Sequence, residues 1–198
     1  MGSLPSIVGH TRIGILSDTH LGNQPLWDEV GTAFAGCDLI LHSGDVSHPQ
    51  VLDRCEQWAP VLAALGNHDD PCHDDPRVKP MQLLDIEGFR LAMVHEMDPE
   101  DEPIAELSKR FLFGERADIF VCGDSHYERM DFRDGVLQVN SGSAVLPHNY
   151  SQRLGTVAIL DLAPGQLRAR IIRLGELPGL PNPGVEFTFD GTTVHCLG

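Results

Sequence analysis

The feature that most constrains this chain is that five short apolar segments all end on polar side chains able to bind a metal or another ligand. The segments ILSDTH at residues 15–20 and VCGDSHY at residues 121–127 both end with an aspartate, a hydroxyl residue and a histidine in that order. The other three run into Gly44–Asp45, residues 66–69 (GNHD) and His95. The carboxyl edge of an α/β sheet is where ligands bind. We therefore predict an α/β fold with a ligand site at one sheet edge.

Two of these segments place a carboxylate and an imidazole two residues apart. Asp18 precedes His20 in one segment, and Asp124 precedes His126 in the other. In an extended segment, residues i and i+2 point to the same side. Each pair is therefore predicted to give two ligands to one centre.

The full donor set consists of imidazoles, carboxylates and one amide, with no thiolate in the pattern. Such a set suits manganese, iron, zinc or nickel better than a soft-metal site, and it holds more donors than one ion needs. Taken singly, these residues also have structural interpretations: Asp45 as a helix cap, Asn67 as a turn residue and His95 as a hydrogen-bonded core histidine. Their shared position after successive strands favours the metal site.

The periodicity of apolar residues predicts helices at residues 24–34, 49–58 and 100–113. Strands are predicted at residues 13–16, 39–41, 61–65, 81–86, 90–95, 119–122, 128–132, 136–140, 156–162 and 167–174. Glu87–Gly88 and Asp134–Gly135 are typical of tight hairpin turns. The second half is richer in strands, which indicates two packed sheets flanked by helices.

Composition sets limits on partners and compartment. The formal net charge of −15 disfavours general nucleic-acid binding and binding to anionic membranes. The five cysteines are odd in number and form no C-x-x-C pair, which favours a reducing compartment. There is no apolar run of membrane-spanning length and no signal-peptide pattern, so we expect a cytoplasmic protein.

In order and spacing, the five motifs resemble those of the calcineurin-like metallophosphoesterases. The short chain and the stretch at residues 139–143 (VNSGS) look like the small bacterial and archaeal phosphodiesterases related to the retromer scaffold subunit. The resemblance runs from about Arg12 to Leu174. It implies an α/β four-layer αββα sandwich of two mixed β-sheets flanked by helices. Residues 1–198 are then expected to form a single metallophosphoesterase domain, with its core at about 12–174 and a C-terminal edge strand or tail at 175–198.

The resemblance also implies a site with two divalent metal ions, with manganese expected first and iron, zinc, nickel or magnesium as alternatives. Asp45 would bridge the two ions. His68 would meet a phosphate oxygen or protonate the leaving group, and Asp69 would orient His68 by a hydrogen bond. The implied ligands of the first ion are Asp18, His20, Asp45 and His126, and those of the second are Asp45, Asn67, His95 and Asp124.

The reaction expected of such a site is in-line attack on phosphorus by a metal-bridging hydroxide. A small phosphate ester, more specifically a diester, is the expected substrate. The alternative is a catalytically weak or inactive scaffold with the same fold; the intact GNHD motif with His68 favours catalysis. A dimetal redox protein is disfavoured because nothing else marks an electron pathway. Whether several copies of the chain assemble is left open.

Three positions depart from the family pattern. Asp124 stands where relatives usually carry histidine, and Glu96 stands where they carry glycine. Pro147–His148 stands where a basic residue is frequent. The first change replaces a neutral ligand with an anionic one, and the second adds a carboxylate at the substrate mouth.

Overall fold

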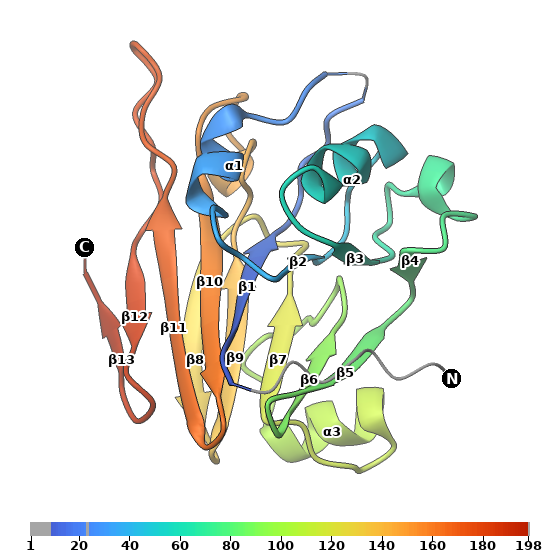
Figure 1. The fold of residues 1–198 in the computed structure, drawn as a ribbon, viewed down its shortest axis with the longest axis vertical. Helices are drawn as coiled ribbons and strands as arrows, with labels where there is room; N and C mark the ends of the chain where they lie inside the picture. Colours follow the sequence, from blue (N-terminus) through green and yellow to red (C-terminus); the bar gives the residue numbers. More distant parts are fainter. Residues whose placement is uncertain (1–8, 23, 198) are drawn as a thin grey trace.

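The computed structural model describes residues 9–22 and 24–197. Within these ranges the strands form one eight-stranded and one five-stranded sheet (Figure 1). In spatial order, the larger sheet contains β13 (Val194–Cys196), β12 (Phe187–Phe189), β11 (Gln166–Arg173), β10 (Thr156–Ala163), β1 (Thr11–Leu16), β2 (Leu39–His42), β3 (Val61–Ala64) and β4 (Val78–Lys79). The smaller sheet contains β5 (Gln82–Ile86), β6 (Phe89–Met93), β7 (Ile119–Cys122), β9 (Val136–Ser141) and β8 (Glu128–Arg133).

Three layers of buried apolar side chains show that the architecture is the expected four-layer sandwich. One layer joins the larger sheet to α1 (Asp28–Ala33) and α2 (Pro49–Glu56). A second fills the space between the sheets and includes Ile13 and Met93. The third joins the smaller sheet to α3 (Ile104–Leu112), which lies apart from α1 and α2 in Figure 1. Each sheet therefore has one face against the other sheet and one face against helix.

Both sheets are mixed, and their parallel parts position the site. In the larger sheet β1, β2, β3 and β4 run parallel, whereas β1 and β10 are antiparallel. In the smaller sheet β6, β7 and β9 run parallel. Because parallel strands end at the same edge, the segments that follow β1, β2, β3, β6 and β7 emerge next to one another.

The elements agree with the sequence prediction except at some ends. The helix predicted from residue 24 begins at Asp28, after Pro25, and the helix predicted from residue 100 begins at Ile104, after Pro103. A proline disfavours the helical conformation of the residue before it, so both helices begin later. The hairpin at Glu87–Gly88 is confirmed, and both residues have the positive φ that a type I′ turn needs.

Smaller elements were missed by the sequence prediction. The two-residue strand β4 and two 3-10 turns, at Asp70–Cys72 and Pro147–Asn149, lie in segments for which no helix or strand was predicted. The segment after residue 174, in contrast, was expected to be an edge strand or a tail, and it supplies β12 and β13 at the edge of the larger sheet. Among the described residues, no helix is both long enough and apolar enough to cross a membrane.

Candidate metal centre

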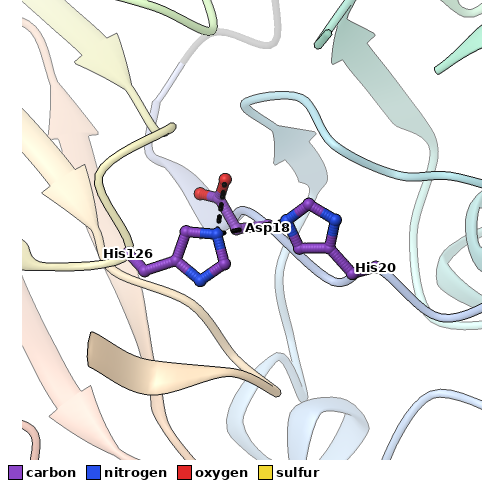
Figure 2. Close-up of side chains that lie close together, drawn as sticks. All are labelled: Asp18, His20 and His126. Atoms are coloured by element: carbon purple, nitrogen blue, oxygen red, sulfur yellow. Dashed lines mark hydrogen bonds and ion pairs between the residues drawn. The ribbon is translucent and has the colours of Figure 1, made fainter. Parts of the chain in front are cut away.

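The first group of donors is formed by Asp18, His20 and His126, which come from the segments after β1 and β7 (Figure 2). The Nε2 atoms of the two histidines are 3.1 Å apart, and their rings stack with centroids 5.0 Å apart. His126 Nε2 also lies 3.6 Å from Asp18 Oδ1. Two ring nitrogens and a buried carboxylate oxygen therefore converge on one point.

The second group is formed by Asp18, Asp45 and His95. His95 Nε2 lies 3.3 Å from Asp45 Oδ1 and 3.5 Å from Asp124 Oδ1. Asp124 thus stands beside His95, while His126 stands beside Asp18 and His20. The prediction that Asp124 and His126 serve one centre together is wrong, because the two side chains point to different groups.

Asp45 lies between the two groups. Its Oδ2 is 3.3 Å from His20 Nε2, and its Oδ1 is 3.3 Å from His95 Nε2. Oδ1 also accepts a hydrogen bond from the backbone N–H of His68, with 3.0 Å between the heavy atoms. The two oxygens of one carboxylate therefore each face an imidazole of a different group.

Backbone carbonyls fix the tautomers of two of these histidines. His95 Nδ1 donates to Ser43 O at 2.8 Å, and His126 Nδ1 donates to Leu146 O at 2.9 Å. When Nδ1 carries the proton, the neutral ring presents a lone pair at Nε2, as metal-binding histidines do. Both rings therefore present Nε2 to the centre.

Unpartnered buried atoms show that these residues fit metal ions. Asp18 Oδ1 and His95 Nε2 are buried and have no hydrogen-bond partner among the described residues. His95 Nε2 lies within ion-pair distance of Asp45 Oδ1, at 3.3 Å, without forming a hydrogen bond with it. A buried polar atom without a partner is costly, and a coordinated cation would remove that cost at both atoms. The mixed oxygen and imidazole set suits hard or borderline divalent ions.

The protonation equilibria of these side chains reflect the same crowding. Burial raises the pKa of Asp18 to about 6. Burial opposes the charged form of His95, but its interactions with Asp45 and Asp18 outweigh this and raise its pKa to about 9. Burial likewise opposes the charged form of Asp45, but His95 and the His68 N–H lower its pKa to about 2. Burial lowers the pKa of His20. The carboxylates of Asp45 and Asp18 thus favour positive charge at His95.

The backbone at the site differs from the extended form assumed from the sequence. The residues concerned have φ values in the left-handed region: Asp18 (52°), His20 (45°), Asp45 (55°), Asp124 (69°) and His126 (62°). The argument that residues i and i+2 point to the same side therefore does not apply. Non-glycine residues adopt this conformation at a cost, and such residues cluster at functional sites.

Two of the glycines that precede the donors are required for close packing. A Cβ on Gly44, which has a φ of 98°, would lie 2.5 Å from the His95 ring. A Cβ on Gly66 would overlap the backbone nitrogen of Asp45. Larger residues at either position would push His95 or Asp45 out of the centre.

Asp69 has a different role from the one the resemblance implies. Its buried carboxylate accepts backbone N–H bonds from Gly66 (2.7 Å), Ser47 (2.7 Å) and Asp45 (3.1 Å). The described residues show no hydrogen bond between the His68 ring and the Asp69 carboxylate. The expected orienting contact is therefore absent here, and Asp69 instead fixes the turn that carries Asp45.

His68 and Asn67 both lie on the open side of the centre. Both side chains are exposed. The His68 ring meets the His20 ring edge-on, with centroids 5.3 Å apart. Asn67 lies at a groove that His95 also lines. Both residues are thus within reach of a ligand that enters from solvent.

Sequence reasoning missed the residues that hold these loops together. Ser143 Oγ donates to Asp18 O at 2.7 Å and accepts from Leu146 N at 2.8 Å, so it ties the loop of Asp18 to the loop whose carbonyl holds His126. Ser143 belongs to the VNSGS stretch, which was the available signal. His42 is fully buried, and its Nε2 lies 3.1 Å from Thr19 Oγ1.

Comparison with protein families gives a match over most of the chain. Residues 11–165 match the model of the calcineurin-like phosphoesterase superfamily domain. A probable metallophosphoesterase of Methanothermobacter thermautotrophicus is 31% identical over 167 residues, covering 82% of this chain and 92% of the relative. A probable metallophosphoesterase of Mycoplasma pneumoniae is 27% identical over 160 residues, covering 79% of this chain and 93% of the relative.

Solved structures share the fold at low sequence identity. Vps29 of Chaetomium thermophilum superimposes with a TM-score of 0.69 at 13% identity, covering 94% of this chain and 95% of the other. A structure described as a novel archaeal phosphodiesterase has a TM-score of 0.60 at 20% identity, covering 82% of this chain and 100% of the other.

Proposed function

This chain belongs to the calcineurin-like phosphoesterase superfamily, and from that membership we propose that it is a phosphodiesterase that uses two divalent metal ions. The observation that carries the proposal is the position of Asp45. Each of its two carboxylate oxygens lies 3.3 Å from an imidazole Nε2 of a different donor group. A carboxylate shared in this way suits a pair of ions better than one.

We propose that the ions are held by the residues on either side of Asp45, with manganese as the first candidate. The first ion would be held with Asp18, His20 and His126, and the second with Asn67, His95 and Asp124. Two such ions would activate a water molecule as the nucleophile and would supply positive charge around the phosphate oxygens.

The chain's own residues complete the hydrolysis. The water oxygen forms a new bond to phosphorus as the bond from phosphorus to the leaving oxygen breaks. His68 is exposed beside His20, where its imidazole can donate a proton to the leaving oxygen or hold a phosphate oxygen. Asp69 acts through the backbone of Asp45, so it is a positioning residue.

The charge of the site favours a diester over a monoester. With Asp18, Asp45 and Asp124 as ligands, three carboxylates reduce the charge of two dications from about +4 to about +1. The exposed Glu96 adds a further negative charge at the mouth. A phosphodiester carries one negative charge and a monoester carries close to two at neutral pH, so the monoester loses more from each added carboxylate.

Metal analysis of the purified protein, combined with a screen of phosphodiesters and phosphomonoesters, tests the proposal. We expect two manganese ions per chain after loading and faster hydrolysis of diesters. A protein that binds two ions but cleaves no ester would instead support the scaffold alternative. Binding of a single ion, unchanged by substitution of Asp45, would contradict the bridging role.

Partners and compartment follow as part of the same proposal. We expect a small phosphate ester as substrate. All five cysteines are free, four of them buried, which fits a reducing compartment such as the cytoplasm.

A further inference from the structure

A groove of about 540 Å³ opens beside the candidate metal centre. Its polar end is formed by Asn67 and His95, which belong to the second donor group. Its remaining wall is mostly apolar and comes from the ends of β3, β6 and α3 and from the segment before β5: Leu65, Pro80, Met81, Val94, Phe111 and Phe113. This volume is within the range of small-molecule sites, which are about 300–1,000 Å³. The groove is therefore continuous with the centre and large enough for an organic group.

Phe113 is the least expected residue of this wall. It directly follows α3, and the residue is 96% exposed. Its φ of 54° is left-handed, at a helix end where glycine is the usual residue. A bulky side chain is unfavourable in this conformation, and an exposed phenyl ring makes no compensating contact in the core. Binding of a ligand gives a reason for an aromatic side chain here.

The charges at the groove describe the group it would accept. Arg110 lies in the wall, but it forms an ion pair with Glu102 at 2.6 Å and donates a hydrogen bond to Asp98 O. Its positive charge is therefore already balanced by Glu102. Glu96 is exposed and, among the described residues, pairs with no cation. The groove therefore presents apolar surface and one negative charge, which disfavours a second anionic group on the ligand.

His68 lies beside the first donor group and outside the groove wall. Its ring packs against His20 of that group. Because we place the leaving oxygen near His68, the groove suits the ester group that stays on phosphorus. Resting on the proposed function, we infer that the substrate is a phosphodiester whose retained ester group is flat, apolar and uncharged, and that this group binds in the groove against Phe113.

A protein partner or a second copy of the chain fits this surface less well. A stable protein interface buries about 800 Å² on each partner. Of the large apolar side chains that the described residues leave exposed, Phe113 alone belongs to the groove wall. One ring over a concave, partly polar wall matches a small group better than an extended interface.

The test measures binding and turnover separately on the manganese-loaded protein. Calorimetry compares diphenyl phosphate with dimethyl phosphate, and kinetics compares bis(para-nitrophenyl) phosphate with methyl para-nitrophenyl phosphate, which have the same leaving group. The variant is Phe113→Gly, which removes the ring and suits the left-handed backbone, so its melting temperature should not fall. The matched control is Leu83→Ala, an apolar residue of β5 that is 42% exposed and outside the groove.

We expect wild type to bind diphenyl phosphate at least about tenfold more tightly, and Phe113→Gly to reduce this preference by about three- to tenfold, as for loss of an aromatic contact. Leu83→Ala should leave the preference unchanged. Glu96→Gln should raise affinity for the dianion phenyl phosphate by about fivefold, with a smaller effect on diphenyl phosphate.

The outcomes separate the two proposals. A wild-type protein without a preference for the aromatic diester, or a preference that survives in Phe113→Gly, overturns the groove assignment. Self-association that Phe113→Gly abolishes, without any aromatic preference, would assign the surface to a second copy instead. A further outcome is that wild type shows the binding preference and Phe113→Gly loses it as expected, while neither para-nitrophenyl diester is cleaved. In that case the groove assignment stands and the catalytic proposal fails.

Discussion

Replacing Asp69 by asparagine is the most informative single change, because the structure and the family resemblance give this residue different roles. Its two carboxylate oxygens accept three backbone N–H bonds from residues of the loops that carry Asp45 and Asn67. Oδ2 accepts from Asp45 and Gly66, and Oδ1 accepts from Ser47. An asparagine that keeps its oxygen toward the first two donors must turn its NH₂ group toward the N–H of Ser47.

The size of the effect follows from these contacts. A hydrogen bond to a charged group contributes about 1.5–3 kcal/mol, and a neutral one about 1 kcal/mol. Asp69→Asn loses one charged bond and weakens two others by at least about 0.5 kcal/mol each, so we expect the free energy of unfolding to fall by at least about 2.5 kcal/mol. For a chain of this size that is a decrease of at least about 5 °C in melting temperature. Because the turn at Asp45 is loosened, affinity for both ions should fall as well.

Urea unfolding in the presence of a chelator measures the first effect without bound metal, and elemental analysis of the reloaded protein measures the second. Asp70→Asn, the same substitution at the exposed neighbouring position, is the control and should change neither quantity. A variant with full stability and two tightly bound ions but much slower turnover would refute the positioning role. That result would favour an effect of Asp69 on His68.

Three further substitutions test the proposed roles. Asp45→Ala should remove both ions and hydrolysis, because its carboxylate faces both donor groups; two tightly held ions in elemental analysis would contradict the bridge. His68→Ala should keep both ions and lower turnover by about 10²–10⁴, the usual effect of losing a general acid or base, whereas wild-type rates would give His68 a purely structural role. Asp124→His should shift metal preference toward zinc and strengthen inhibition by inorganic phosphate, because a neutral ligand replaces an anion 3.5 Å from His95 Nε2. Unchanged metal preference and unchanged inhibition would show that Asp124 is not a ligand.

The sequence by itself determined the class of the fold and the edge at which the site would form. Apolar periodicity and turn residues are local signals, because they reflect which side chains of a short segment face a core. The strand at residues 119–122 and the hairpin at Glu87–Gly88 were predicted for this reason. The donors were recognised because each follows directly after a buried strand. The first residues of α1 and α3, Asp28 and Ile104, were missed. The periodicity placed both helix starts too early because the prolines before them were not weighed against it.

Only the tertiary structure decided how the donors are grouped and what surrounds them. Asp124 and His126 are two residues apart, yet left-handed backbone directs them to different groups. The carboxylate of Asp69 meets amides of two other loop positions, 22 and 24 residues away in the chain, as well as that of nearby Gly66. The groove beside Phe113 is built by segments as distant as residues 65 and 113. The physical reason is that such contacts depend on where packed strands and helices place their connecting loops, and no local spacing in the sequence records that distance.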